Sequence, residues 1–273
     1  MNKISKFLMA SVMSLTVLAG CGSNGGGSVE LQEGDTVKIG LNYELSGGTS
    51  TYGMAMDKGS RLAIKQYNEK EGHKYNIEYV SLDNKGDSNE AVSIATRMMT
   101  EEKVAFIVGP ATSTASIATY PVAGQNQVPV LSPAVTQNGG MLDANGEAYP
   151  YAWRVCFEDS AQASAMAIYS YRDLGKRKAV IYQDVKNDYA TGLAEDFQKK
   201  FEELGGEVVS VESYQQGDTD FNAVITNIKG MDFDVLYIPG YYSESGLIIK
   251  QARDAGITQT IVGPDGMDSP KLM

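Results

Sequence analysis

Short apolar runs rich in β-branched residues alternate with amphipathic segments from residue 37 onward. Runs that are apolar along their whole length are typical of parallel strands buried on both faces, so this order predicts an α/β fold with helices covering parallel sheets. The predicted strands are 37–43, 75–82, 104–108, 128–132, 151–157, 178–183, 207–214, 234–238 and 260–262. The predicted helices are 54–69, 89–100, a helix following Ser113, 160–174, 189–204, 221–229 and 244–255; in the first, Ala55, Leu62, Ala63 and Tyr67 are expected to face inward.

The stretch 104–116 carries the first indication of a binding site. The apolar run VAFIV is stopped by Gly109-Pro110, and the polar cluster Thr112-Ser113-Thr114 then precedes a helical segment. Hydroxyl side chains at a helix start accept hydrogen bonds from free backbone N–H groups, and the positive end of the helix dipole attracts an anion. A loop that only caps the helix would have the same kinds of residue. This stretch alone therefore does not distinguish a binding site from an ordinary capped loop.

The alternation breaks once, over residues 133–150, where Gly139-Gly140, Asn145-Gly146 and Pro150 interrupt it. A second α/β series follows the 151–157 strand, which we interpret as a crossover between two lobes. Ligands bind at the carboxyl ends of strands in open α/β sheets, so the loops at those ends should converge on a cleft. These loops are 46–52, 112–114, 132–136, 187–189, 240–242 and 263–266. These loops offer hydroxyls and helix N-termini for a carboxylate, one acid for an ammonium group, and tyrosines for an apolar body. This combination suits a small zwitterionic ligand.

Residues 1–20 are predicted to be a targeting segment rather than part of the fold. Lys3 and Lys6 precede an apolar run that is long enough for a signal-peptide core and short for a bilayer span. The run ends in Leu18-Ala19-Gly20-Cys21, which resembles the lipobox of bacterial lipoproteins and implies lipidation of Cys21. An ordinary secretory signal is the alternative. Residues 21–36 are Gly- and Ser-rich at their start and are expected to be a flexible tether.

The net charge argues against some classes of binding partner, and the cysteine count indicates the state of the Cys156 thiol. The formal net charge is −11, and removing Lys3 and Lys6 with the targeting segment takes it from −11 to −13. So acidic a chain argues against nucleic acid and anionic membrane surfaces as partners. With Cys21 lipidated, Cys156 is unpaired, and its apolar neighbours predict a buried, inert thiol.

Enzyme signatures are mostly absent, and we expect no catalytic residues, cofactor or metal. The single histidine, His73, lies in a polar turn. No G-x-S-x-G nucleophile motif and no P-loop motif occur, and the first predicted strand is not followed by a G-x-G-x-x-G nucleotide-binding turn. The segment 83–87 resembles a calcium loop faintly, but Lys85 stands where an oxygen ligand is needed. An exported α/β hydrolase remains one alternative function. An assay for hydrolysis of small amides and esters would detect it.

A resemblance to a known family is carried by six segments in order: VGPATSTAS, PVLSPAVT, WRVCFEDSAQ, NDYATGLA, PGYYSESGLIIKQARDAGI and VGPDGMDSPKL. Together they resemble the type I periplasmic binding proteins, in particular the leucine/isoleucine/valine-binding proteins of ABC amino-acid importers. The resemblance implies two Rossmann-like lobes joined by a hinge, with lobe one at 37–152 and the crossover strand and lobe two at 153–273. It also implies a lipid-anchored monomer at the outer face of the cytoplasmic membrane, or in the periplasm, that delivers a branched-chain or aliphatic amino acid to permease and ATPase subunits.

The same resemblance assigns the site residue by residue. The ligand's carboxylate matches Ser113, with Thr136 and Tyr241 nearby, and its ammonium matches the carbonyl of Ala134, the hydroxyl of Thr136 and Asp265. The walls of the side-chain pocket match Tyr52 and Tyr189, an acid at the cleft entrance matches Asp159, and the side-chain pocket includes Ala111 and Thr112.

Two departures from the family pattern qualify these assignments. Ala111 and Thr112 stand where the most similar members have a larger aliphatic residue and a cysteine, which predicts a differently shaped and more polar pocket. The family's chain also continues well past the position of Met273, so we expect this sequence to lack a C-terminal part. A sensor of the same fold that signals to a receptor, and a binder of a short-chain amide, remain alternative functions.

Overall fold

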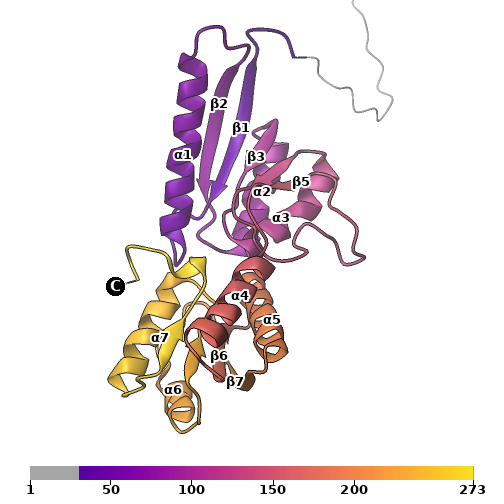
Figure 1. The fold of residues 1–273 in the computed structure, drawn as a ribbon. Helices are drawn as coiled ribbons and strands as arrows, with labels where there is room; N and C mark the ends of the chain where they lie inside the picture. The colour runs from indigo at the N-terminus through magenta and orange to yellow at the C-terminus, as the bar shows by residue number, and fades with distance from the viewer. Residues whose placement is uncertain (1–30, 273) are drawn as a thin grey trace, which may run out of the picture. The chain divides into compact units, whose positions relative to one another are not determined.

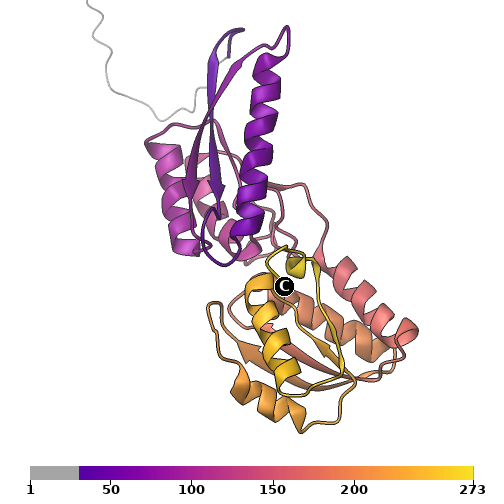
Figure 2. The ribbon, with the colours of Figure 1, turned by 90° about the vertical axis from the view of Figure 1, so that its left-hand side faces the viewer.

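The structure is a computed structural model that describes residues 31–272. The expected targeting segment and the lipidation site at Cys21 lie outside these residues, as does most of the expected tether. The helices and strands among the described residues all belong to the unit that begins at Glu33. Figures 1 and 2 show two sheets, each with its own covering helices, called here the first lobe (β1–β5 with α1–α3) and the second lobe (β6–β9 with α4–α7).

The first lobe is a five-stranded sheet in the order β2-β1-β3-β4-β5, and every strand pair is parallel, as the apolar runs predict. Its strands are β1 (Thr36–Tyr43), β2 (Asn76–Asp83), β3 (Phe106–Val108), β4 (Val130–Ser132) and β5 (Ala152–Arg154). Its helices are α1 (Ser50–Glu69), α2 (Ser88–Thr100) and α3 (Ser113–Asn126).

Alternation along β1 separates the two faces of this sheet. Ile39, Leu41 and Tyr43 belong to the core cluster under α1, which includes Ile64. The intervening Gly40 faces α2, where an added Cβ would lie 2.6 Å from the sulfur of Met98. A side chain at position 40 would therefore push α2 away, and glycine lets that helix approach the sheet closely.

The second lobe is a four-stranded parallel sheet in the order β7-β6-β8-β9. Its strands are β6 (Lys178–Asp184), β7 (Glu207–Tyr214), β8 (Val235–Tyr237) and β9 (Thr260–Val262). Its helices are α4 (Asp159–Ile168), continued by a π-helical turn η1 (Tyr169–Asp173), then α5 (Asp188–Glu203), α6 (Asn222–Lys229), α7 (Tyr242–Asp254) and the short 3-10 turn η2 (Asp265–Met267). Val180 and Tyr182 of β6 pack toward α6 and α7, whereas Ala179 and Ile181 pack toward α4 and α5.

The first helix departs from its predicted start and orientation. It begins at Ser50, so part of the expected 46–52 loop is helical. Ala55, Leu62 and Ala63 are exposed and only Tyr67 is half-buried, so the predicted inward face is wrong. The buried positions are Ser50, Gly53, Asp57 and Ile64, because small and polar residues make the contacts with the sheet: Asp57 accepts a hydrogen bond from Ser81 at 2.7 Å.

The predicted strands at 104–108 and 151–157 are shorter in the structure. Within the second of these, β5 pairs in parallel with β4, and the predicted lobe boundary between residues 152 and 153 falls inside it. Beyond β5, Cys156 is half-buried rather than buried, because its neighbours Val155 and Phe157 are exposed. Partial burial still raises the pKa of the Cys156 thiol, which favours the protonated form over the reactive thiolate.

Candidate functional site

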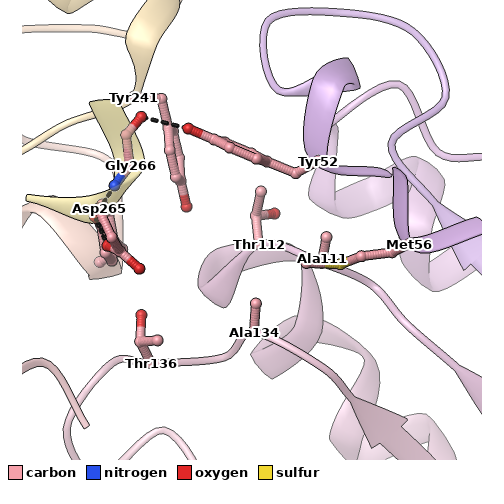
Figure 3. Close-up of a pocket in the computed structure, with 10 residues that line it drawn as sticks. Tyr52, Met56, Ala111, Thr112, Ala134, Thr136, Tyr241, Asp265 and Gly266 are labelled. Atoms are coloured by element: carbon pink, nitrogen blue, oxygen red, sulfur yellow. Dashed lines mark hydrogen bonds between the residues drawn. The ribbon is translucent and has the colours of Figure 1, made fainter. Parts of the chain in front are cut away.

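A cavity of about 120 Å³ lies where the carboxyl ends of the two sheets meet. The first lobe contributes residues from the first turns of α1, from the loop before α3 and from the loop after β4, and the second lobe contributes residues from the starts of α5, α7 and η2 (Figure 3). Eight of the ten positions predicted to contact ligand line it, and Met56 and Gly266 complete the lining; the eight are Tyr52, Ala111, Thr112, Ala134, Thr136, Tyr189, Tyr241 and Asp265. The strand-end rule therefore brings the predicted loops together.

Aromatic rings form the wall that both lobes share. Tyr189 and Tyr241 of the second lobe are stacked, with ring centroids 5.0 Å apart and planes 4° apart. Tyr52 of α1 lies 6.1 Å from the Tyr241 ring and 5.4 Å from the Tyr242 ring. Stacked and edge-to-face rings hold one another in place, so the wall is a rigid apolar surface.

Hydrogen bonds close the site from both lobes. The Tyr52 hydroxyl donates to the carbonyl of Gly266 at 2.5 Å (Figure 3), and the Thr51 N–H donates to the Tyr242 hydroxyl at 3.2 Å. A further hydrogen bond between the lobes runs from the Asp188 N–H to the Thr114 hydroxyl at 3.0 Å. These contacts join residues that are far apart in sequence and make the arrangement of the two lobes specific.

The acid at one end of the cavity is Asp265, the first residue of η2. Tyr189 donates its hydroxyl hydrogen to the Asp265 carboxylate at 2.6 Å, and the same hydroxyl accepts from the Gly266 N–H at 2.9 Å. Figure 3 shows the Asp265 carboxylate and the Thr136 side chain pointing toward each other across the cavity. The carbonyl of Ala134 accepts from the Thr136 N–H at 3.0 Å, which leaves it one lone pair for a ligand.

Two of the predicted ligand residues do not line the cavity. Ser113 is 1% exposed, and its hydroxyl accepts a long hydrogen bond of 3.4 Å from the Gln137 N–H. Asp159, the first residue of α4, is fully buried. Its backbone N–H donates to the Thr136 carbonyl at 2.8 Å, so it lies beside the cavity rather than in its wall.

Glu44 is a buried acid beside the cavity that the sequence did not single out. Its carboxylate accepts from the Ala111 N–H, the Thr112 N–H and the Thr112 hydroxyl at 3.0, 3.0 and 2.9 Å. Burial raises its pKa, and the three hydrogen bonds oppose that rise. Because Thr112 donates its hydroxyl hydrogen to Glu44, it does not offer that hydrogen to a ligand, and the expectation of a more polar side-chain pocket does not follow from this threonine.

Met56 and Gly266 line the cavity but were not predicted from the sequence, where little marks them as ligand-binding residues. Met56 sits one helical turn after Tyr52 on α1, a relation that a correct helix start would have given. Gly266 follows Asp265 directly and serves through its backbone.

Within residues 31–272, no group of three or more His, Cys, Asp or Glu side chains is placed to hold a metal ion, and no helix is long and apolar enough to cross a membrane.

A protein-family model described as "Periplasmic binding protein" matches residues 36–272, nearly all of the described chain. The chain belongs to this family. Its members are binding proteins rather than enzymes, in agreement with the expected absence of catalysis, and membership implies an exported protein. The resemblance to the type I periplasmic binding proteins is therefore confirmed.

Named relatives and solved structures agree with this assignment. This periplasmic binding protein is 30% identical over 239 residues to the Leu/Ile/Val-binding protein BraC3 of Rhizobium johnstonii, covering 86% of this chain and 63% of the relative. It is 29% identical to the Leu/Ile/Val-binding protein homolog 3 of Brucella melitensis, covering 85% of this chain and 62% of that protein.

Two solved structures confirm the two-lobed fold class. LivJ of Streptococcus pneumoniae, determined in complex with isoleucine, is 41% identical with a TM-score of 0.79 over 87% of this chain and 66% of that one. The leucine-binding protein LivK of Thermotoga maritima is 37% identical with a TM-score of 0.77 over 86% and 65%. The chain thus spans between 62% and 66% of the length of these four relatives.

Proposed function

We propose that this periplasmic binding protein is the extracytoplasmic substrate-binding component of an ABC importer and that it binds a branched-chain or other aliphatic α-amino acid. The observation that carries the proposal is the cavity itself, which pairs an apolar wall with one acid and nearby hydroxyls. Such a small set of convergent polar groups in an apolar pocket is typical of small-molecule sites. The names of LivJ, LivK and the Leu/Ile/Val-binding relatives support an amino acid as the ligand.

The ammonium group is proposed to bind between the lobes. Asp265 supplies the negative charge, and the Thr136 hydroxyl and the Ala134 carbonyl supply the remaining acceptors. Since an ammonium group has three N–H donors, this set satisfies all of them.

The carboxylate is proposed to bind at the start of α3, where Ser113 and the helix dipole favour an anion, with Thr136 and Tyr241 beside it. Glu44 already accepts from the amides of Ala111 and Thr112. The amide of Ser113 is therefore the one proposed to receive the ligand.

The ligand's side chain is proposed to lie against Tyr52, Tyr189, Met56, Ala111 and Thr112. Because Thr112 donates its hydroxyl hydrogen to Glu44, its oxygen can accept a hydrogen bond from a ligand side chain but cannot donate one, so a ligand carbonyl oxygen placed there would lose hydrogen bonds to water without replacing them, at a cost of about 1–3 kcal/mol. This penalty favours aliphatic over amide side chains.

The remaining parts of the proposal concern the whole protein. Ligand binding is proposed to hold the two lobes together by hinge closure. The closed monomer, anchored through a lipid on Cys21, would then present its ligand to permease and ATPase subunits. Micromolar affinity needs about −8 kcal/mol, or about −0.9 kcal/mol for each of about nine ligand heavy atoms, which is within the range of small enclosed ligands.

Calorimetry on the purified chain with leucine, isoleucine, valine, leucinamide and the amine formed by removing leucine's carboxyl group tests the proposal. Leucine, isoleucine or valine should bind, whereas the amide and the amine should bind at least about tenfold more weakly. Equal affinity for leucine and its amine would refute the carboxylate assignment.

The acid is tested by Asp265→Asn, with Asp268→Asn as the matched control in the same exposed segment. A lost hydrogen bond to a charged group costs about 1.5–3 kcal/mol, so Asp265→Asn should weaken binding by about 10- to 150-fold. Asp268→Asn should bind as the unchanged protein does. Normal binding by Asp265→Asn would refute the ammonium assignment.

A further inference from the structure

Asp159 is a buried acid that is only partly satisfied. Its carboxylate is fully buried at the start of α4, and one of its oxygens, Oδ2, has no hydrogen-bond partner within residues 31–272. A buried carboxylate usually accepts several hydrogen bonds, because leaving an oxygen unpaired is costly. The proposed function gives Asp159 no contact that explains this arrangement.

Gln162 connects Asp159 to the acid of the cavity. Its Nε2 donates to Oδ1 of Asp159 at 2.7 Å, and its Oε1 accepts from the backbone N–H of Asp265 at 3.1 Å. Gln162 lies three residues after Asp159, on the same face of α4. One side chain therefore uses both ends of its amide to hold α4 against the Asp265 turn.

Asp159 is also tied to the opposite side of the proposed ammonium position. Its backbone N–H donates to the carbonyl of Thr136 at 2.8 Å. Thr136 and Asp265 point toward each other across the cavity (Figure 3). Asp159 thus holds both groups that would receive the ammonium, one through its backbone and the other through Gln162.

Mostly acidic groups surround Asp159. Asp265 of η2 and Asp196 of α5 repel its negative charge, and Tyr237 of β8, Tyr241 before α7 and the Cys156 thiol are the other titratable groups near it. Burial raises the pKa of Asp159 to about 6; the hydrogen bond from Gln162 and the nearby Thr136 side chain oppose the rise, and the charge of Asp265 adds to it. The nearby cation, Arg154 of β5, is ion-paired with Glu158 and donates to the carbonyls of Val135 and Gln137, so a bound ammonium would add a further positive charge to this set of acids.

We propose that Gln162 is a positioning residue for the ammonium end of the cavity, holding Asp159 and Asp265 in one unit so that ligand binding drives a proton from Asp159 into solvent. The inference rests on the proposed function, because it takes the ligand to carry an ammonium group. The step balances: the carboxyl group of Asp159 loses one proton to water, and the charge of the nearby ammonium offsets the negative charge that remains.

The proton linkage predicts how affinity depends on pH. Ligand binding favours the ionised form of Asp159, so the dissociation constant should be constant well above pH 6 and should rise toward tenfold for each unit below it. Asp159→Asn cannot release the proton and should bind with a dissociation constant that is flat between about pH 5 and 8.

Gln162→Met, which keeps the length of the side chain and removes both hydrogen bonds, separates positioning from packing. Loss of the donor to Asp159 favours its protonated form, so the midpoint of the pH profile should move upward by about half a unit or more, and leucine should bind about tenfold more weakly at pH 7. Gln198→Met on α5, whose amide donates only to Glu202, is the matched control and should leave both values unchanged.

Two measurements decide the proposal. Calorimetry with leucine in buffers of different ionisation enthalpy measures the proton release, and carbon NMR of the Asp159 carboxyl follows its titration in the ligand-free chain. Leucine binding with the same pH profile in Gln162→Met as in the unchanged protein would overturn the role of Gln162 and leave the proposed function intact. Failure of the unchanged protein to bind any amino acid would overturn both.

Discussion

The hydrogen bond from Tyr52 to Gly266 should contribute measurably to ligand affinity. It joins α1 of the first lobe to η2 of the second, so it exists only while the lobes are together. Tyr52→Phe removes the hydroxyl and keeps the ring that contacts Tyr241 and Tyr242. The substitution therefore tests the hydrogen bond separately from the aromatic wall.

The expected size follows from the burial of the acceptor. A typical protein hydrogen bond has a net value of about 0.5–1.5 kcal/mol, and leaving a buried carbonyl unpaired raises the cost toward 1–3 kcal/mol. Gly266 is buried, so we expect a loss of about 1–2 kcal/mol in binding, which is about five- to thirtyfold in the dissociation constant. Most of the change should appear as faster ligand release, because affinity differences between related complexes lie mainly in the dissociation rate.

Calorimetry gives the affinity and stopped-flow fluorescence gives the release rate. Tyr79→Phe is the matched control, because Tyr79 is an exposed tyrosine of β2 whose hydroxyl accepts only a long 3.4 Å hydrogen bond from Arg61. Tyr79→Phe should bind normally. If Tyr52→Phe bound leucine within twofold of the unchanged protein and released it at the same rate, the contact would have no role in holding the lobes together.

Further predictions concern α1, the side-chain pocket and the thiol. Gly53→Ala should lower the melting temperature, because its Cβ would lie 2.1 Å from the Glu44 carbonyl oxygen, whereas Gly59→Ala on the same helix has open space and should stabilise the fold by about 0.5–1 kcal/mol in thermal unfolding. A lower melting temperature for both would contradict the packing of α1. Ala111→Val should shift preference from leucine toward valine in competition binding, because the added methyls enter the cavity; an unchanged preference would place position 111 outside the side-chain pocket. Cys156 should react with iodoacetamide at pH 7.5 more slowly than free cysteine does, since its pKa is raised, and equal rates would show that the thiol is not shielded.

The sequence predicts the elements that are defined by backbone periodicity. The nine predicted strands and seven predicted helices all have counterparts in the structure, and the 207–214 and 260–262 strands match β7 and β9 in full. Parallel topology then brings the loops at strand ends together, which is why eight predicted positions line one cavity. The predicted and observed elements agree because burial of a strand or helix determines the spacing of apolar residues along the chain. The parallel direction of the strands then determines which loops lie at the same edge of the sheet.

What the sequence misses depends on contacts between distant side chains. The inward face of α1 carries Gly53, Asp57 and the half-buried Ser60, whose hydroxyl pairs with that of Tyr43 at 3.0 Å, so few hydrophobic residues mark this face. Glu44 has no local signal, because its three donors come from residues 67 and 68 positions later. A buried acid with such partners looks like a surface residue when only the sequence is read.

The proposed distribution of ligand-binding groups between the lobes would link ligand binding to closure. The groups proposed to receive the carboxylate lie mainly on the first lobe, at the start of α3, whereas Asp265 lies on the second. A free amino acid carries both charges a few bonds apart, so it can contact both sets only when the lobes are together. The Tyr52–Gly266 hydrogen bond forms in the same arrangement and adds to the same equilibrium. A ligand that lacks either charge can occupy the cavity but engages the proposed binding groups of mainly one lobe, and so it should neither bind tightly nor hold the protein closed.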